Sequence, residues 1–404
     1  MITIGEAQNI VLDRIFPLTT EQVHLLQGVG RVVAEDQIAP WDVPPADNSA
    51  MDGYAFAFAD WDGGPLRVAG FLPAGACETR PVGPGEAVKI MTGAPLPPRC
   101  DTVVPIEEAE AAGGVVRFTG TVQQGSHVRP RGEDLCRGGI AVAAGSLLRP
   151  QEIGILSATG KTTVKVFRRP QVAILSTGDE LLEPGSPLSP GRIINSNSYS
   201  LAAQVIEAEG VPLMLGIAPD DPEATREKIS AGLHADLLVT TGGVSVGDRD
   251  FVKESILALG GTILFCKVAM KPGKPVVFAM VGGKPVIALP GNPVAAMVAF
   301  EQFVRPALLK MMGRSRLFRP TVRATLEEEV ANRGERPHLV RSLVTLKDGR
   351  YLATTTGNQS SARLSSLTRG NGLILLAPGV RLSAGTEVEV QLLDREFEAG
   401  GCRP

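Results

Sequence analysis

The sequence contains little histidine and cysteine, and neither residue type is spaced for metal chemistry. Four histidines are scattered through 404 residues, and none falls in the H-E-x-x-H pattern. Five cysteines stand far apart, with no C-x-x-C pair. These absences argue against a zinc site, and they fit a reducing compartment.

Long apolar runs and a strong charge imbalance are also missing. The longest suggestive uncharged run, 285–300, contains three prolines and falls short of the roughly 20 apolar residues of a membrane span. The N-terminus lacks the basic and apolar regions of a signal peptide. The net charge is −3, and no lysine- or arginine-rich run stands out. We therefore expect a cytoplasmic protein with no membrane or nucleic-acid partner.

Glycine and proline are abundant, with 46 and 31 residues, which predicts many loops. The hydrophobic content of 44% and the charged content of 21% are those of a globular protein rather than a disordered one. A chain of this length is expected to form roughly two to four domains.

The first 168 residues mix helical and strand patterns. Thr3 and Glu6 form a capping box before an apolar repeat, which predicts an opening helix. The same capping pattern at Thr19–Gln22 predicts a second short helix. Short apolar runs separated by glycine and proline predict a small β domain within 42–133. Because 134–168 ends in another helical pattern, it is expected to return to the N-terminal helices, which makes the β domain an insertion.

From residue 169 to residue 313, apolar strands alternate with helical segments, as in a parallel sheet with crossover helices. Asp221–Pro222 and Asn292–Pro293 each place a capping residue before a proline at the first helical position. The expected strands are 171–177, 211–217, 235–241, 261–268 and 284–290, and the expected helices are 198–209, 221–233, 250–259 and 292–312.

After residue 320 the helical patterns stop. Four strand-like segments, with Asp348–Gly349 as a hairpin turn, predict a small β-barrel. The fold class is thus multidomain α/β plus β. The expected domains are a helical linking region of 1–45 and 134–168, an inserted β domain of 46–133, an α/β domain of 169–315 and a barrel domain of 316–404.

A glycine loop follows the expected strand 235–241. Gly242, Gly243 and Gly247 allow close approach of the backbone to an anion, and Ser245 adds a hydroxyl group. The helix after the loop begins near Asp250. Ligands of open α/β sheets bind at the carboxyl ends of strands, where this loop lies. The alternative is a tight connection whose glycines serve only the turn.

Three other expected strand ends carry acids or lysines. Thr177 and Gly178 can approach an anion, and Asp179 or Glu180 beside them can hold a cation. Asp220 follows the next strand, and the segment KPGKP presents Lys271 and Lys274. The acids can also be helix caps or turn residues, and the lysines can be solvated. Together, carboxylates and lysines without histidine favour a phosphate ligand with Mg²⁺.

Seven segments resemble, in order along the chain, the motifs of the MoeA family, which is also seen as the gephyrin E domain. Any one of them is weak evidence, but seven in sequence are highly specific. They are NSAMDGYAF (48–56), IMTGAPLP (90–97), RPRGEDL (129–135), TGGVSVGD (241–248), KPGKP (271–275), LPGNP (289–293) and TTGNQSSARL (355–364).

The resemblance implies a MogA-like α/β domain, an elongated helical linking region with the inserted β domain, and a C-terminal β-barrel domain. It implies a molybdenum insertase, which converts adenylylated molybdopterin and molybdate to molybdenum cofactor and AMP. Mg²⁺ is implied as cofactor, and the implied partners are a second copy in a homodimer, a MogA-type adenylyltransferase and recipient molybdoenzymes. The inserted domain of one subunit is implied to face the α/β domain of the other.

The resemblance also implies roles for individual residues. The catalytic acids are Asp52, Asp134, Glu180, Asp220 and Asp250, of which the last three are also the metal ligands. Molybdate is implied to bind near Lys274, Pro275, Arg341 and Ser361. The full substrate-binding set is Thr92, Thr177, Gly178, Gly242, Gly243, Ser245, Gly247, Lys267, Lys271, Lys274, Pro275, Pro290, Pro293, Arg341 and Ser361.

Three positions depart from the family pattern. Ala295 and Ala362 stand where serine is common, and Asn195 stands where aspartate is common, which puts an anion contact and a metal contact in doubt. Two other functions stay open. One is the MogA-type adenylylation of molybdopterin, against which the flanking motifs argue. The other is a gephyrin-like scaffold, which ranks low because no linker or second module flanks the domain.

Overall fold

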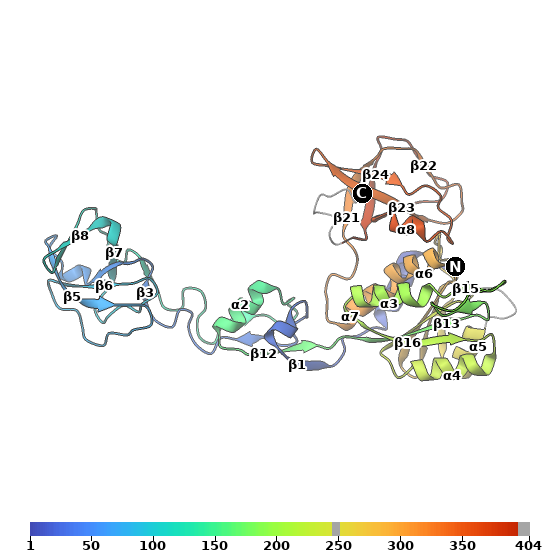
Figure 1. Ribbon diagram of the computed structural model, residues 1–404, viewed down its shortest axis with the longest axis horizontal. Coiled ribbons are helices and arrows are strands. Elements are labelled where there is room, and N and C mark those ends of the chain that lie inside the picture. The colour runs from blue at the N-terminus through green and yellow to red at the C-terminus, as the bar shows by residue number, and fades with distance from the viewer. Residues whose placement is uncertain (245–250, 395–404) are drawn as a thin grey trace. The chain divides into compact units, whose positions relative to one another are not determined.

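The computed structural model describes residues 1–244 and 251–394, which form two compact units (Figure 1). One unit comprises Met1–Glu21 and the chain from Phe167 onward, and the other comprises Gln22–Val166. The predictions for Ser245, Gly247 and Asp250 lie outside the described residues. The division into four domains stays a prediction.

The chain opens with helix α1 (Ile4–Asp13), as the capping box predicts. The Thr3 hydroxyl accepts the Glu6 backbone N–H at 3.2 Å, and the Glu6 carboxylate accepts the Thr3 backbone N–H at 2.7 Å. Ala7 and Val11 are buried in the same core as the α/β sheet. This helix therefore belongs to the unit that contains the sheet.

The core of this unit is a six-stranded mixed sheet in the order β16-β13-β17-β20-β19-β18. The first four strands are parallel, and β19 is antiparallel to both of its neighbours. The alternation of strands and helices was predicted, but β19 was missed. The strands are β13 (Gln171–Thr177), β16 (Val211–Ala218), β17 (Leu237–Thr241), β18 (Thr262–Phe265), β19 (Val277–Val281) and β20 (Lys284–Leu289).

Alternate residues of the central strands enter two cores, one on each face of the sheet. Val172 and Ile174 pack with α3 and α6, whereas Ala173 and Leu175 pack with α4 and α5. Because both faces are covered, the strands are nearly continuous apolar runs. The helices are α3 (Asn197–Glu207), α4 (Pro222–Gly232), α5 (Phe251–Ala258), α6 (Pro293–Ala299) and α7 (Arg305–Met311).

A π-helical segment, η4 (Phe300–Val304), connects α6 to α7. The sequence predicted one helix over 292–312, and the π segment interrupts its regular geometry. Such segments add a residue to a turn and often occur at functional sites. All five of its residues are buried, including Glu301 and Gln302.

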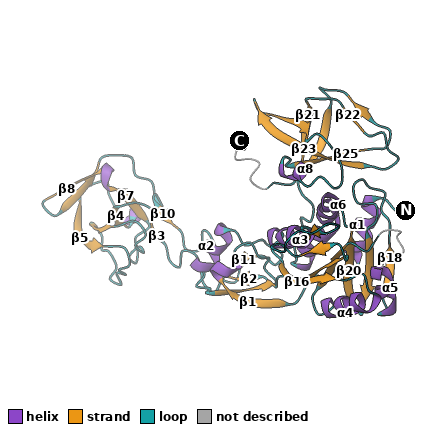
Figure 2. Ribbon diagram, turned by 45° about the vertical axis from the view of Figure 1, so that its right-hand side comes forward, coloured by secondary structure: helices purple, strands orange, loops and turns teal. Residues whose placement is uncertain are grey.

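Five strands close a β-barrel in the order β21-β24-β23-β25-β27 (Figure 2). Asp348 and Gly349, with φ of 51° and 74°, form the predicted hairpin turn between β23 and β24. The elements are β21 (Thr321–Leu326), β22 (Val330–Ala331), β23 (His338–Lys347), β24 (Arg350–Thr355), α8 (Ser365–Thr368), β25 (Gly372–Leu376), β26 (Arg381–Leu382) and β27 (Glu387–Leu392).

The second unit contains a six-stranded sheet in the order β7-β4-β6-β5-β9-β8. The predicted helix at Thr19–Gln22 is wrong, because Thr20–His24 is strand β1, followed by a single 3₁₀ turn over Leu25–Gly28. Pairing of β1 with β12 overrides the local capping pattern. Other elements of this unit are β2 (Gln37–Ile38), β3 (Asn48–Ser49), β10 (Val128–Arg129), β11 (Ile140–Val142), α2 (Pro150–Ala158) and β12 (Thr163–Phe167).

The inserted sheet has its own aromatic core. Phe56 stacks on Phe118 with ring centroids 5.1 Å apart, and Trp61 packs edge-on against both. Tyr54 is buried beside them and packs within this unit. The sheet strands are β4 (Gly53–Phe56), β5 (Leu66–Leu72), β6 (Glu86–Ile90), β7 (Thr102–Pro105), β8 (Ala109–Ala112) and β9 (Val115–Phe118).

No helix in the part of the chain that the structure describes combines the length and hydrophobicity that a membrane span needs.

Candidate functional site

The carboxyl ends of the parallel strands meet at one edge of the mixed sheet. In the register, Ser176 of β13 lies opposite Thr241 of β17, and Thr241 lies opposite Leu289 of β20. Strand β18 runs parallel to β20, because both are antiparallel to β19. The loop that contains Lys271–Pro275 links β18 to β19 and therefore opens at the same edge. Four of the predicted ligand loops thus lie at one edge.

Two of these loops touch through their glycines. Gly242 and Gly243 have positive φ of 89° and 62°, and a Cβ atom on Gly242 would lie 2.6 Å from the Thr177 carbonyl oxygen. A Cβ on Gly243 would lie 2.8 Å from the Thr177 hydroxyl. That hydroxyl is buried and has no hydrogen-bond partner in the described structure. Glycine is required at both positions for this close packing. The Thr177 hydroxyl, next to Gly178, is available for a hydrogen bond to a ligand.

Glu180 and Asp220 follow neighbouring strands, since Thr177 of β13 pairs with Ala218 of β16. Glu180 is exposed and Asp220 half-buried. Asp179 accepts the backbone N–H of Asp220 at 3.1 Å, which ties the two loops together. Among the described residues, no group of three acidic, histidine or cysteine side chains is gathered for a metal ion. Asp221 caps α4 by accepting the Ala224 N–H at 2.8 Å, as the Asp221–Pro222 pattern predicted.

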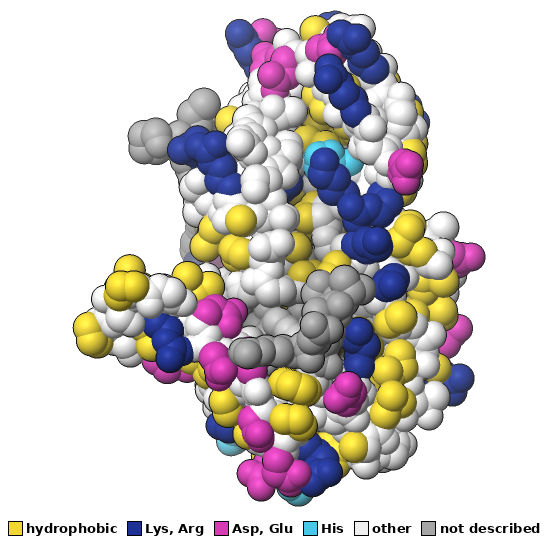
Figure 3. All heavy atoms as spheres, turned by 90° about the vertical axis from the view of Figure 1, so that its right-hand side faces the viewer, with side chains coloured by type: hydrophobic (Ala, Val, Ile, Leu, Met, Phe, Trp, Pro, Cys, Tyr) yellow, Lys and Arg dark blue, Asp and Glu magenta, His cyan; other side chains and the backbone are white. Residues whose placement is uncertain are grey.

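A basic pocket of about 650 Å³ lies where the KPGKP loop meets the barrel domain. Lysine and arginine side chains gather on one face of the molecule (Figure 3), and none of the described residues that line the pocket carries a carboxylate. An uncompensated cluster of cations selects an anionic ligand. The lining residues are Lys271, Pro272, Gly273, Lys274, Pro275, Pro290, Asn292, Ala295, Arg336, Asn358, Gln359, Ser360 and Ser361.

Arg341 lies behind the pocket wall. Its side chain is fully buried, and it donates to the Ser366 hydroxyl at 3.1 Å and to the Ser360 carbonyl at 3.0 Å. Burial lowers the pKa of Arg341 to about 10, and its Nη1 atom has no hydrogen-bond partner in the described structure. The guanidinium therefore adds positive potential through Ser360.

His338 adds a neutral imidazole to the same region. Burial, with the nearby charges of Lys271, Arg341 and Arg336, lowers its pKa to about 4. Its Nε2 atom is buried without a partner among the described residues. At neutral pH the imidazole is uncharged, and so the positive charge here comes from the lysines and arginines.

Several lining residues were not predicted from the sequence. Arg336 donates to the Met270 carbonyl at 2.8 Å, and Gln359 both accepts the Arg341 backbone N–H and donates to the Arg341 carbonyl. Gln359 lies within the TTGNQSSARL motif, which was a usable signal, whereas Arg336 reaches the pocket only through the fold. Asn292 connects two motifs by donating to the Ser361 hydroxyl at 3.2 Å.

Asn195 is 1% exposed and bonds within a buried cluster. Its side-chain oxygen accepts from the Ser176 hydroxyl at 3.0 Å, and its nitrogen donates to the Ser198 hydroxyl at 3.0 Å. In this arrangement the amide is engaged in packing of α3 on β13. Ala295 lines the basic pocket, whereas Ala362 is exposed and is not one of its lining residues.

The remaining predicted residues lie elsewhere. Asp52 and Thr92 are paired in the second unit, where the Thr92 backbone N–H and hydroxyl both donate to one Asp52 oxygen at 2.7 Å. These bonds, led by the backbone one, lower the pKa of Asp52. Asp134 belongs to the same unit. Lys267 is exposed and is not among the described residues that line the basic pocket. Pro293 is the first residue of α6 and follows Asn292 of the pocket lining.

Three family models match consecutive regions of the chain. A model of the MoeA N-terminal region (domain I and II) matches residues 2–160, and a probable molybdopterin binding domain matches residues 173–310. The MoeA C-terminal region (domain IV) matches residues 323–393.

Relatives called molybdopterin molybdenumtransferase extend this likeness. The one from Nostoc sp. is 36% identical, covering 96% of this chain and 93% of the relative, and the one from Bacillus subtilis is 35% identical, covering 93% and 90%. The solved molybdopterin biosynthesis MoeA protein from Pyrococcus horikoshii matches with a TM-score of 0.85 and 31% identity over 98% of this chain and 99% of that chain. These likenesses confirm the predicted fold class, and the chain belongs to the MoeA family.

Proposed function

We propose that this protein is a molybdenum insertase that converts adenylylated molybdopterin and molybdate to molybdenum cofactor and AMP. The observation that carries the proposal is the basic pocket at the carboxyl edge of the sheet. Membership of a family whose relatives are called molybdopterin molybdenumtransferase supports it.

The two substrates carry negative charge on the pyrophosphate of the pterin and on molybdate. Lys271 and Lys274, exposed on a loop held by prolines, would bind these oxyanions, with Ser361 and the backbone beside Pro275 as further donors. Gly178, Gly242 and Gly243 would let the pterin phosphates approach the strand ends. The positive charge of Arg341, from behind the wall of the basic pocket, would add to the attraction for these oxyanions.

Glu180 and Asp220 fit a magnesium site, because Mg²⁺ is commonly held by one or two carboxylates together with substrate phosphates. Their place on neighbouring strand ends supports this assignment. When bound, the ion would neutralise charge on the phosphates. The protein side chains would otherwise act by positioning, since cleavage of a phosphoanhydride beside bound molybdate needs no covalent protein intermediate.

Asp52, Asp134 and Thr92 belong to the other unit, and we assign them to the facing wall of the site in a homodimer. The Thr92 bonds to Asp52 hold that carboxylate ionised, which supports a role in contacting a cation or orienting water. A MogA-type adenylyltransferase would supply the substrate, and molybdoenzymes would receive the product. A cytoplasmic location stays a prediction.

Incubation of the purified chain with adenylylated molybdopterin, molybdate and magnesium tests the proposal. We expect AMP release that depends on molybdate, together with reconstitution of a cofactor-free molybdoenzyme. An absence of AMP at every molybdate concentration would overturn the insertase function. Formation of adenylylated molybdopterin from ATP would instead identify an adenylyltransferase.

A further inference from the structure

Arg336 provides the one guanidinium group among the described residues that line the basic pocket. It is half-buried and lies in the segment that precedes β23. The Lys271 backbone N–H donates to the carbonyl of Pro337, the next residue, at 2.8 Å. The backbone at Arg336 is therefore held against the loop that carries Lys271 and Lys274.

The side chain of Arg336 is fixed through a single nitrogen atom. Nη1 donates to the carbonyl of Met270 at 2.8 Å, and Met270 is fully buried. Nε and Nη2, which share one edge of the guanidinium group, bond to no described residue and are not buried. An edge with two N–H groups binds two oxygens of a carboxylate or phosphate side by side. The contact with Met270 thus orients Arg336 and leaves this edge free.

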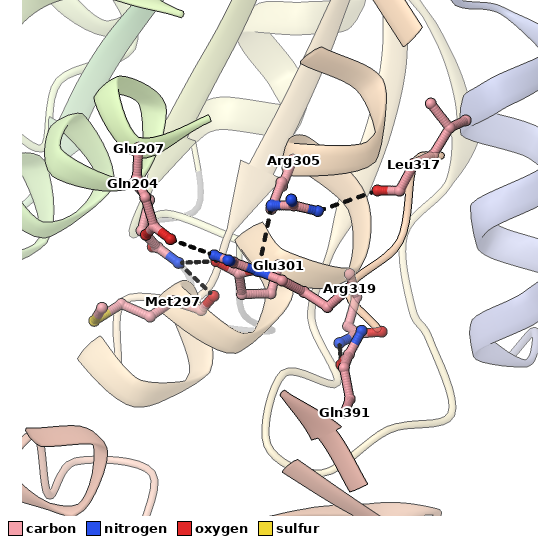
Figure 4. Close-up of polar contacts among 9 residues, drawn as sticks. Gln204, Glu207, Met297, Glu301, Arg305, Leu317, Arg319 and Gln391 are labelled. Carbon is pink, nitrogen blue, oxygen red and sulfur yellow. Dashed lines mark hydrogen bonds and ion pairs between the residues drawn. The ribbon is translucent and has the colours of Figure 1, made fainter. Parts of the chain in front are cut away.

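Arg319 shows how a structural arginine of this chain is satisfied. It donates from Nε to Glu301 at 3.0 Å and from Nη2 to Glu207 at 2.7 Å (Figure 4). Within residues 1–244 and 251–394, Arg336 forms no such ion pair, although Glu335 precedes it in the sequence. Because its free edge belongs to a pocket whose described lining holds no carboxylate, Arg336 is available to an anionic ligand.

No other cation of this region can supply the same contact. Arg341 is fully buried and donates to the Ser366 hydroxyl and the Ser360 carbonyl. Lys271 and Lys274 offer ammonium groups, which act as point charges and lack a planar pair of donors. The pocket volume of about 650 Å³ is that of a site for a whole small molecule. Beside the two lysines, a guanidinium edge would fix the orientation of an oxyanion.

We propose that Arg336 is a substrate-binding residue whose Nε–H and Nη2–H groups donate side by side to two oxygens of one tetrahedral oxyanion in the basic pocket. The inference rests on the proposed insertase function for the identity of that oxyanion, which is molybdate or a phosphate of the pterin substrate. It assigns to the site a residue that none of the seven motifs contains. An arginine that only fastened the barrel to the sheet would need the Met270 contact alone.

Two variants separate the paired donors of Arg336 from its charge. Arg336→Lys keeps the positive charge and a donor for the Met270 carbonyl but loses the planar pair of donors. Arg336→Gln keeps one donor group and loses the charge as well. Arg333→Gln is the matched control, because Arg333 is an exposed arginine between β22 and β23 and is not among the described lining residues. The melting temperature of each variant shows whether its fold is preserved.

Titration calorimetry of the full chain with sodium molybdate and, separately, with inorganic pyrophosphate measures the binding. We expect Arg336→Lys to weaken binding of the oxyanion at least about tenfold, the value of one charged hydrogen bond, and Arg336→Gln to weaken it further. A loss confined to molybdate or to pyrophosphate identifies the oxyanion that Arg336 holds, and a loss for both means that its subsite accepts either.

Three results would overturn the proposal. They are wild-type affinity for both probes in the two Arg336 variants, no binding of either probe to the wild-type protein, and an equal loss in Arg333→Gln. A loss accompanied by a lower melting temperature in Arg336→Lys would also contradict it, because Arg336 would then only support the fold.

AMP release separates this inference from the insertase function. Arg336→Lys should raise KM for the affected substrate about tenfold while kcat changes little, as for a residue that binds substrate and transition state alike. If the wild-type protein binds the probes through Arg336 but releases no AMP, the oxyanion subsite stands and the insertase function fails. If it releases AMP while both Arg336 variants keep wild-type binding and KM, the insertase function stands and this inference fails.

Discussion

Lys271 and His338 pair as a parallel β-bridge between the sheet domain and the barrel. The Lys271 N–H donates to the Pro337 carbonyl at 2.8 Å, and the Leu339 N–H donates to the Lys271 carbonyl at 2.8 Å. The backbone of the KPGKP loop is therefore held by the barrel, while the Lys271 side chain is exposed at the pocket. The barrel thus shapes the basic pocket and supplies part of its wall.

Replacement of Lys274 by alanine is expected to lower AMP release about a hundredfold, because an exposed ammonium group that stabilises phosphate or molybdate charge is lost. Stability should change by less than about 0.5 kcal/mol, since the side chain is exposed. Lys347→Ala, in the β23–β24 hairpin, is the matched control and should keep full activity. Wild-type activity in Lys274→Ala would mean that this lysine is only solvated.

The pH dependence of stability should report His338. Its pKa is about 4 in the folded protein and 6.5 in an unfolded chain, so the unfolded state binds more protons between these values. Stability contributed by the neutral imidazole is complete above pH 6.5 and is lost as the pH falls toward 4. The loss is expected to reach roughly 3 kcal/mol.

His338→Gln is the control for this prediction. Urea unfolding of the wild-type protein and of this variant, at several values between pH 4 and pH 7, separates the histidine from the many carboxylates that titrate lower. The wild type should lose more stability than the variant over this range. Parallel curves for the two proteins would show that His338 does not titrate as its buried position requires.

Much of the fold could be predicted from local patterns. The capping box of Thr3 and Glu6, the cap at Asp221 and the turn at Asp348–Gly349 depend on residues within four positions of one another. Prediction failed where contacts between segments that are far apart in the sequence determine the secondary structure. Thr20–His24 became a strand because β12 pairs with it, and the π segment at Phe300–Val304 leaves no mark in the apolar periodicity.

The residues of the site could be predicted where they lie within the recognised motifs. Lys271, Lys274 and Ser361 come together because the loops that hold them meet at the pocket. Arg341 was predicted to contact substrate, but burial of its side chain behind Ser360 depends on how α8 packs, which no short motif shows. Arg336 was missed because only the contact between the segment that precedes β23 and the Lys271 loop brings it to the pocket.

Breaking the Glu301–Arg319 pair should be far more costly than breaking an exposed pair. Burial alone would lower the pKa of Arg319, but Glu301 and Glu207 offset this and raise it. Glu301→Gln would leave the guanidinium buried with weaker partners, and the free energy of unfolding is expected to fall by about 3 kcal/mol. Urea denaturation measures the change.

Glu223→Gln on α4 is the matched control for that measurement. Glu223 pairs with Arg226, and both side chains are well exposed, so the loss should stay below about 0.5 kcal/mol. A change in Glu301→Gln no larger than in this control would show that the buried pair contributes little beyond its packing.

Mixing two inactive variants tests whether Asp52 acts across a dimer. In Asp52→Asn the Thr92 N–H and hydroxyl keep an oxygen acceptor but lose the negative charge, so the fold should survive while AMP release falls. Lys274→Ala removes an ammonium group from the opposite wall of the site.

If each site combines Asp52 of one subunit with Lys274 of the other, a mixed dimer has one intact site. Equal mixing after unfolding and refolding should then restore about a quarter of wild-type activity, because half of the dimers are mixed. If both residues serve the same subunit's site, every site in the mixture carries one defect, and activity stays at the level of the separate variants.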